Sequence, residues 1–466
     1  MKPSSTEAAT PDPAPQAASL PPAAQGAAIG GVSKLVTAAT GALTTILVAR
    51  TLGSDGAGAF AIVVTLGIIA ASGLSLGLEQ GAIYHVVRGR WSPLAAWRAL
   101  QAAALVIGAL FVGACLALRA LVPSAFAGLD TAQTAVAAAG AAAGLSWLYS
   151  GAVALARHDY VSFALAPAAQ STAMAILVPA LAYFAGVTGA VAGFAASNAL
   201  TAAWIGWRVR AGARNGTAAA AARPVPLLRE AARFGLYAYA ANALQTLNYR
   251  ADLFLLSAIG GAAVVGHYSV AMSVTSVIWL LPPALAELVF PRVATLEARG
   301  RTLDRELLET KAVRHASLLA TVSALGAVAI LFGLVELVYG PDFAPATALG
   351  LILVPGCALL AVAKVFAAAV VGHGRPQLML RVTVLVTPPT IAAYALLIPL
   401  WGASGAALAS TLSYACTFFF AARAFARAAG RAPWPLVRFG RPEIDDYLAL
   451  ARSLLERLTA AAARSS

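Results

Sequence analysis

Apolar stretches about as long as a membrane-spanning helix recur through most of this sequence. A helix that crosses the hydrocarbon core of a bilayer takes about 20 apolar residues, and such stretches follow one another from residue 27 to about residue 426. Charged residues and glycine or proline turns separate them. The pattern predicts twelve spans, at residues 27–50, 57–80, 97–119, 131–155, 160–184, 187–208, 233–258, 262–289, 313–338, 344–371, 378–400 and 402–424.

The composition is that of a chain embedded in the bilayer over most of its length. Charged residues make up 11% of the chain and hydrophobic residues 60%, whereas about 25% of a soluble domain is charged. This balance excludes a soluble enzyme with a single anchor. We therefore expect an all-α polytopic membrane protein.

The basic residues predict the orientation of the chain. Lysine and arginine outnumber aspartate and glutamate by 32 to 19, and cytoplasmic loops carry such an excess. Only Arg50 and Arg119 lie near the loops after odd-numbered spans, so both termini are expected in the cytoplasm. Without a basic run with interleaved aromatics, the charge does not indicate nucleic-acid binding. The loops after even-numbered spans hold Arg88, Arg90, Arg157, Arg208, Arg210, Arg214, Arg223, Arg229, the stretch from Arg292 to Lys311, Arg375 and Arg381.

The twelve spans divide into two halves that resemble each other. Residues 189–197 match residues 402–410 at an offset of 213, and an earlier set of residues matches at an offset of 208. Six spans are an even number, so both halves enter the membrane in the same orientation, as in a parallel duplication with a site between the halves. The earlier set pairs Gly53, Gly58, Phe60 and Glu79 with Gly261, Gly266, Tyr268 and Glu287.

Five units are expected along the chain. They are a disordered cytoplasmic tail at 1–26, an N-terminal six-helix lobe at 27–208, a cytoplasmic linker at 209–232, a C-terminal six-helix lobe at 233–424 and a cytoplasmic tail with an amphipathic helix at 425–466.

The sequence contains no motif for catalysis or metal binding in a suitable context. It has no GxxxxGK[ST] phosphate loop, its five histidines form no HExxH, and its three cysteines lie in apolar stretches without ligand spacing. Residues 73–77 fit the nucleophile-elbow pattern around Ser75, but they lie inside a span rather than at a strand-to-helix turn. We expect a protein that is not an enzyme and uses no metal or other cofactor.

Three cationic residues lie within predicted spans. Lys34, Arg250 and Lys364 belong to spans 1, 7 and 10, and a charge inside a membrane costs several kcal/mol unless it faces a cavity or a partner. If the two halves enclose a cavity, these residues make it suitable for an anion, and phosphate or diphosphate is the best match to arginine and lysine donors. The alternative for Lys34 and Lys364 is snorkelling toward the cytoplasmic surface.

Three acidic residues lie within spans as well. Glu79, Asp252 and Glu287 are candidates for binding a coupling proton or sodium ion, whose movement across 100 mV supplies about 2.3 kcal/mol per charge. Glu79 and Glu287 are also close enough to cytoplasmic ends to be interfacial. Arg250 and Asp252 are about 200° apart around a helix, so they are not expected to face each other.

Two further segments have mechanistic interpretations. Pro282 and Pro283 interrupt span 8 and predict either a hinge or a static kink. In the C-terminal tail, Pro442 marks a helix start followed by acidic residues. One apolar stripe on this helix favours a position on the membrane surface, with docking to a cytoplasmic partner as the alternative.

The sequence resembles a known family of transporters. The segment ARTLGSDGAGAFA, at 49–61, and the longer stretch 33–89 around it resemble the start of bacterial polysaccharide flippases of the multidrug/oligosaccharidyl-lipid/polysaccharide exporter superfamily. Residues 248–274 resemble the start of that family's second half, and residues 338–346 and 372–376 are similar to later segments. Lipid II flippase relatives typically carry two additional spans that this sequence does not show.

The resemblance implies a fold and a function. It implies two six-helix lobes around a V-shaped cavity in the bacterial inner membrane, and alternating access for an undecaprenyl-diphosphate-linked oligosaccharide in polysaccharide biosynthesis. It supports a diphosphate-binding role for Lys34 and Arg250, whose spans line the cavity in the family. The expected partners are this glycan lipid, membrane lipids and the polysaccharide polymerase or glycosyltransferase machinery.

Two other function classes compete with this interpretation. An ion-coupled multidrug exporter of the same superfamily shares the twelve-span plan, but a carrier of cationic drugs is expected to have an acidic, aromatic cavity. A membrane glycan polymerase or ligase is expected to carry its catalytic groups on a large outer loop, and every predicted outer loop is short.

Overall fold

A computed structural model describes residues 22–126, 128–213, 224–279 and 281–449, together with 452 and 456. Within these ranges the chain is helical and contains no strand, which confirms the all-α prediction. The α-helices are α1 (Pro22–Ile68), α2 (Leu78–Val87), α3 (Pro93–Leu121), α4 (Thr131–Ala156), α5 (Tyr160–Ala213), α6 (Pro224–Thr275), α7 (Pro282–Ala298), α8 (Thr302–Gly333), α9 (Val335–Tyr339), α10 (Ala344–Gly372), α11 (Pro376–Ala429) and α12 (Trp434–Val437).

Four of the long helices are pairs of spans joined at a glycine. The chain bends in α1 at Gly53, in α5 at Gly186, in α6 at Gly261 and in α11 at Gly402. Each of these glycines has a φ between 55° and 78°, a conformation that glycine adopts at little cost. Eight stretches of the described chain are long and apolar enough to cross a bilayer. Dividing the helices α1, α5, α6 and α11 at their glycines gives twelve membrane-crossing segments in the predicted order.

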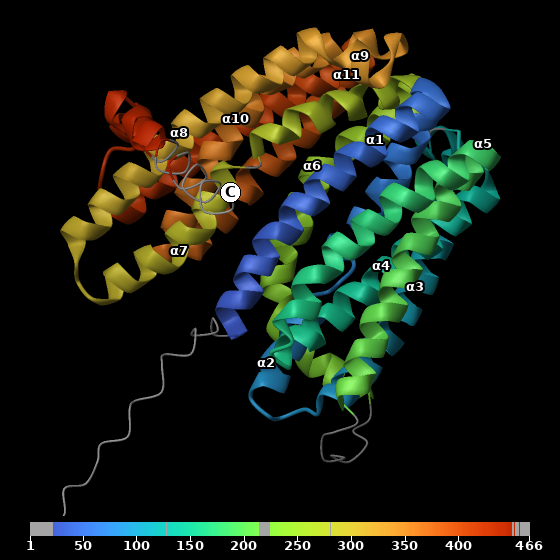
Figure 1. Cartoon of the computed structure of the whole chain (residues 1–466), viewed down its shortest axis with the longest axis horizontal. Coiled ribbons are helices and arrows are strands. Elements are labelled where there is room, and N and C mark those ends of the chain that lie inside the picture. The colour runs from blue at the N-terminus through green and yellow to red at the C-terminus, as the bar shows by residue number, and fades with distance from the viewer. Residues whose placement is uncertain are drawn as a thin grey trace, which may run out of the picture.

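The spans form two lobes that meet at one end (Figure 1). Helices α1 to α5 make the N-terminal lobe, and α6 to α11 make the C-terminal lobe. The lobes lie side by side near α9 and the bend of α1. Toward the opposite end, α7 and α8 diverge from α1, whereas α6 stays packed on α2. Leucines on the outer surface are exposed, for example Leu105 at 76% and Leu110 at 70%, which suits contact with lipid rather than water.

The two halves are related by the predicted duplication, and they touch at equivalent glycines. A Cβ at Gly58 would lie 1.8 Å from the carbonyl oxygen of Ala262, and a Cβ at Gly266 would lie 2.0 Å from that of Ser54. Ser54 is 208 residues from Ala262, and Gly58 is 208 residues from Gly266. The contact is therefore reciprocal, and it confirms the offset of 208.

The second predicted offset, 213, is wrong by three residues. The bends at Gly186 and Gly402 correspond to each other, with φ of 58° and 55°. Gly189 packs on the carbonyl of Leu181 as Gly405 packs on that of Leu397. All of these pairs are 216 residues apart. The small residues that follow each bend are so similar that a shifted alignment gives as many matches in the sequence.

Spans 2 and 8 are interrupted at equivalent places rather than continuous. The first passes through a π-turn at Ile69–Gly73 before α2, and the second through a 3-10 turn at Ser276–Trp279 before α7. Pro282 and Pro283 lie in the first turn of α7. Backbone N–H groups there have no acceptor within the helix, so proline costs no hydrogen bond. The prolines thus begin a new helix, and the change of direction lies before them.

The expected units differ slightly from the helices. The described part of α1 begins at Pro22, so the last residues of the proposed tail are helical, and α11 continues to Ala429. Residues 1–21, 214–223 and most of 450–466 lie outside the described residues, and so does the end of the amphipathic helix.

Candidate substrate cavity between the lobes

A cavity of about 250 Å³ lies between the lobes, close to the end where they meet. Spans 1 and 2 contribute one wall and spans 7 and 8 the other. Polar and aromatic side chains share the lining with aliphatic ones. The lining residues are Thr45, Val48, Ala57, Phe60, Ala61, Val64, Thr65, Arg250, Asp252, Leu253, Tyr268, Ser269, Met272, Ser273, Ser276 and Trp279.

Arg250 supplies the cation on the cavity wall. It is half-buried, and no carboxylate of the described residues lies within 4 Å of its guanidinium. A planar guanidinium can donate two parallel hydrogen bonds to one phosphate group. The structure therefore leaves Arg250 available to an anion in the cavity.

Lys364 contacts Trp279, one of the residues that line the cavity. Its Nζ lies 5.4 Å from the centre of the Trp279 ring, which is the geometry of a cation–π contact. Lys364 is half-buried on α10, and it too has no carboxylate within 4 Å in the described part of the chain. The sequence placed Arg250 and Lys364 at one site, and the structure brings both to the region of Trp279.

Asp252 forms no salt bridge with Arg250, in line with the angle between them around the helix, although both line the cavity and their charges interact. Asp252 is 1% exposed. Its carboxylate accepts hydrogen bonds from the Tyr268 hydroxyl at 2.7 Å and from the backbone N–H of Leu253 at 2.8 Å. The hydroxyls of Tyr268 and Ser410 are 3.0 Å apart, and that of Tyr394 is 2.9 Å from Ser410. A buried acid is thus the end of a hydroxyl chain across spans 7, 8, 11 and 12.

Lys34 does not line the central cavity, because it forms an ion pair with Glu287. The Nζ atom lies 2.6 Å from both carboxylate oxygens, and the two side chains are 65% and 64% exposed. Lys34 is on α1 and Glu287 on α7, so the pair joins the two lobes where they diverge. A candidate anion ligand and a candidate ion-coupling acid are therefore each other's partner in this structure.

Glu79 occupies a different environment from its counterpart Glu287. It is in the first turn of α2, and the Ser75 hydroxyl donates to its Oε1 at 3.3 Å. Its Oε2 is buried without a hydrogen-bond partner in the described residues. Ser75 is also buried, and its carbonyl accepts from Tyr149 at 2.8 Å, so Ser75 lies within packed helices. No group of three potential metal ligands occurs in the described residues.

Hydrogen bonds join the lobes at the end where they meet. Arg50 donates to the carbonyls of Val338, at 2.7 Å, and Leu337. Ser257 donates to the carbonyl of Ser124 at 2.9 Å. At the diverging end, α2 packs closely on α6, whereas Lys34 and Glu287 join α1 to α7.

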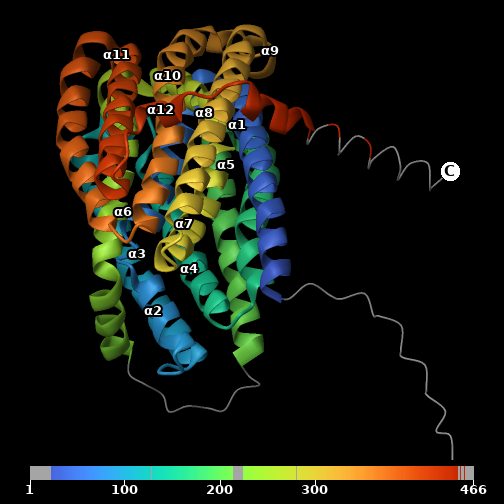
Figure 2. The ribbon, with the colours of Figure 1, turned by 90° about the vertical axis from the view of Figure 1, so that its left-hand side faces the viewer.

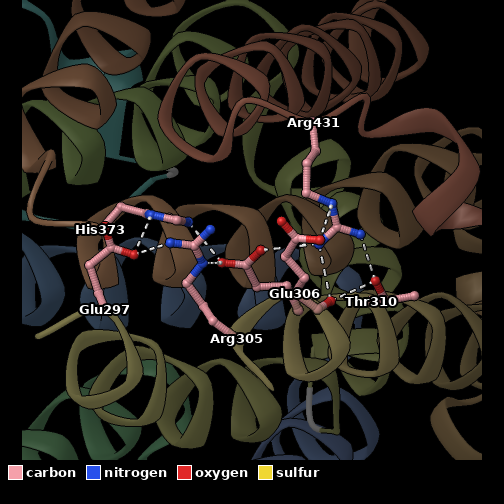
Figure 3. Close-up of polar contacts among 7 residues, drawn as sticks. Glu297, Arg305, Glu306, Thr310, His373 and Arg431 are labelled. Carbon is pink, nitrogen blue, oxygen red and sulfur yellow. Dashed lines mark hydrogen bonds and ion pairs between the residues drawn. The ribbon is translucent and has the colours of Figure 1, made fainter. Parts of the chain in front are cut away.

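A buried charged cluster ties together the ends of α7, α8, α10 and α11 (Figure 3). Glu309 is 1% exposed. Its Oε1 lies 2.7 Å from Nε2 of His373, and its Oε2 lies 3.6 Å from Arg431. Arg305 pairs with Glu297 and contacts Glu309 at 3.7 Å. The sequence predicted a basic cytoplasmic loop here and did not indicate this cluster, because His373 and Arg431 are distant from the loop along the chain.

The start of the C-terminal helix docks on α8 of its own lobe. The chain after α11 crosses over α8 (Figure 2), and the helix occupies residues 441–449. Glu443 lies 3.4 Å from Arg314, and Asp446 lies 3.5 Å from His315. The backbone N–H of Gly440 donates to Glu443 at 2.8 Å, and this bond, followed by Arg314, holds the pKa of the Glu443 carboxyl below its usual value. The described part of this helix is therefore attached to the protein itself.

The fold is similar to solved transporter structures at low sequence identity. Neither a protein-family model nor a curated protein matches the sequence. The chain resembles "Lipid II flippase MurJ, inward closed conformation" with a TM-score of 0.68 at 12% identity, over 88% of this chain and 91% of that one. It resembles an inward-facing multidrug resistance MATE family transporter of the MOP superfamily with a TM-score of 0.65 at 18% identity, over 87% and 98%. The TM-score to an outward-facing MATE transporter is 0.58 at 18% identity, over 88% of this chain and 96% of that one. The chain therefore has the two-lobe fold of these multi-pass membrane transporters.

Proposed function

We propose that this protein is an alternating-access flippase that moves an undecaprenyl-diphosphate-linked oligosaccharide from the cytoplasmic to the outer leaflet of the bacterial inner membrane. The observation that carries the proposal is the pair Arg250 and Lys364. Arg250 lines the cavity between the lobes, Lys364 contacts Trp279 of its lining, and neither forms a salt bridge in the described residues. A diphosphate would supply a direct anionic partner to both groups.

The arrangement of the lobes supports loading from the cytoplasm. The end where they diverge carries the arginine-rich loops, which the positive-inside rule assigns to the cytoplasm, and Arg50 and Ser257 hold the other end together. The higher TM-score to the inward-facing MATE transporter agrees with this state. A substrate diphosphate would therefore reach Arg250 from the cytoplasmic side.

The gap between α1 and α7 suits a substrate with a lipid tail. On the opposite side, a Cβ at Gly81 of α2 would lie 2.4 Å from Cα of Ala231 in α6, so the helix backbones are in contact. Between α1 and α7 the exposed Lys34–Glu287 pair bridges the lobes. A diphosphate could exchange with Glu287 on Lys34 while the tail remains in the bilayer, and then pass to Arg250 and Lys364.

The acidic residues would couple transport to the movement of a proton or a sodium ion. Asp252 can take up a proton or a sodium ion at the cavity wall, next to Tyr268. Glu79 and Glu287 are the other candidates. Pro282 and Pro283, at the start of α7, would set the hinge on which α7 moves.

The second candidate is an ion-coupled multidrug exporter. The buried acid Asp252 beside an aromatic cavity wall of Phe60, Tyr268 and Trp279 favours it, as does the likeness to MATE transporters. Arg250 on the same wall and Lys364 at Trp279 oppose a cationic drug, because like charges repel in a low-dielectric cavity.

The leaflet location of the glycan lipid separates the two functions. In spheroplasts of the host, accumulation of undecaprenyl-diphosphate-linked glycan on the cytoplasmic leaflet is expected on depletion of the protein, and again with Arg250→Ala/Lys364→Ala but not with the matched control Arg299→Ala. Arg299 is an exposed arginine outside the cavity. Normal leaflet distribution in the double variant, with loss of drug efflux in cells with Asp252→Asn, would refute the flippase and support the exporter.

A further inference from the structure

A continuous groove follows the outer face of the N-terminal lobe, away from the central cavity. It consists of two adjoining depressions of about 550 and 610 Å³, which share Trp97 and Arg210. The first lies at the end of α3 and α5 that bears the arginine-rich loops. The second continues along α3, α4 and the latter part of α5. Each volume is within the range of about 300–1,000 Å³ that ligand pockets occupy.

Small side chains create the long part of the groove. Helices α3 and α4 approach so closely that a Cβ at Gly108 would lie 2.7 Å from that of Ala142. From Arg98 to Val112 the groove extends about 21 Å along α3 at 1.5 Å per residue, which exceeds the roughly 15 Å of half a hydrocarbon core. The alanines of the lining are Ala104, Ala109, Ala139, Ala142, Ala143, Ala199, Ala202 and Ala203.

Two arginines stand at one end of the groove. Arg98 and Arg210 are exposed, and no described carboxylate lies within 4 Å of either guanidinium. Arg210 lies 4.4 Å above the ring of Trp97, which is fixed by a 3.1 Å hydrogen bond to Ser150. The neighbouring Arg208 is different, because Asp159 neutralises it at 3.6 Å.

The ends of the groove match the parts of a lipid. Trp207, on the rim beside the two arginines, is 62% exposed, and tryptophan is enriched at the level of lipid headgroups. Basic pockets between helices on the cytoplasmic side suit anionic headgroups. Beyond this end, the lining is apolar apart from Gln101 and Ser146, which bond to each other.

We propose that this groove is a binding site for an anionic glycerophospholipid of the cytoplasmic leaflet. Arg98 and Arg210 hold the phosphate of the headgroup, and one acyl chain lies in the alanine-lined groove. The positive charge of Arg98 and Arg210 favours an anionic lipid, because a ligand without a negative group would leave both guanidiniums without a partner at the membrane interface. The site is independent of the transported substrate.

Native mass spectrometry of the full chain in detergent tests the site. Dioleoyl phosphatidylglycerol and dioleoyl phosphatidylcholine carry the same chains, so their difference in affinity measures the headgroup contribution. With about 1 kcal/mol for each basic residue near the surface, Arg98→Gln and Arg210→Gln are each expected to lower the preference for phosphatidylglycerol about fivefold, and the double variant about 25-fold. The matched control Arg299→Gln, at an exposed arginine outside the groove, is expected to keep the preference.

A second variant tests the acyl chain. Ala139 and Ala203 are exposed on the groove, so the double variant Ala139→Phe/Ala203→Phe should fill the groove without disturbing the helix contacts. It should weaken the binding of both lipids at least tenfold. Inorganic phosphate should not displace phosphatidylglycerol, because the chain provides part of the binding.

Three results would overturn the proposal. The first is equal binding of the two lipids, and the second is a preference that Arg98→Gln/Arg210→Gln leaves as in the control. The third is a dimer of the chain that the phenylalanine variant dissociates, which would assign the groove to a second copy.

Discussion

The ion pair between Lys34 and Glu287 should hold the lobes together only weakly. Each side chain is about two-thirds exposed, and exposed ion pairs contribute about 0.2–1 kcal/mol. At 1.4 kcal/mol per factor of ten, an upper value of about 1 kcal/mol shifts the balance between paired and separated lobes about fivefold. We therefore expect a small coupling energy and a bridge that a phosphate group can replace.

A double-mutant cycle measures this energy directly. Spin labels at Val32 on α1 and Ala298 on α7, in a background without the native cysteines, report the distance between the lobes in the wild type, Lys34→Gln, Glu287→Gln and the double variant. The population of the closely spaced state should fall to a similar extent, at most about fivefold, in each of the three variants. Because screening acts on exposed charges, 1 M salt should abolish most of the effect.

The size of the coupling energy also shows whether the Lys34–Glu287 pair lies in water or in a low-dielectric region. A coupling energy above about 3 kcal/mol that salt does not change would place the pair in a low-dielectric region and refute exchange with a substrate phosphate. Equal populations in all four proteins would show that the pair does not hold the lobes.

Three other predictions concern separate parts of the structure. Tyr268→Phe removes a buried donor from Asp252 and should lower the free energy of unfolding by about 1–3 kcal/mol, measured by denaturation in detergent; an unchanged stability would contradict the hydroxyl chain. Gly58→Ala should disrupt the contact between the lobes and lower the melting temperature in detergent, whereas Gly41→Ala, where a Cβ meets nothing within 4 Å, should not. The lowered pKa of Glu443 means that docking of the C-terminal helix is fully present above the usual value of 4.5 and is lost as pH falls through the lower pKa of the docked state. Hydrogen exchange of residues 441–449 should therefore rise in acid, and in Glu443→Gln it should already be high at neutral pH.

The fold was largely predictable because its signals are local. Span lengths, arginine-rich loops and the glycines at 53 and 261 are each visible within a few residues of sequence. The repeat offset of 208 is fixed by glycines, a phenylalanine or tyrosine and a glutamate in one register. The offset of 213 is wrong because residues 186–197 and 402–413 are almost entirely small, so their register depends on backbone bends that composition does not encode.

The partners of the charged residues were less predictable, because they depend on distant contacts. The absence of a salt bridge between Arg250 and Asp252 in the described residues followed from helix geometry alone. The pairing of Lys34 with Glu287 joins positions 253 residues apart, and nothing local indicates it. Trp279 was also missed, since an aromatic residue inside a span gives no signal of its own until Lys364 is placed beside it.

The Gly58–Gly266 contact has the form of an isologous dimer interface contained in one chain. In a symmetric dimer, a residue near the two-fold axis touches its own copy, and here each glycine touches its repeat counterpart. In a dimer of identical chains, one substitution changes both sides of such a contact. Fusion into one chain lets the halves change separately. Phe60 and Tyr268 occupy equivalent positions of the repeat, but only Tyr268 carries a hydroxyl, which donates to Asp252. The C-terminal half therefore has a polar contact at a position where the N-terminal half has a phenylalanine.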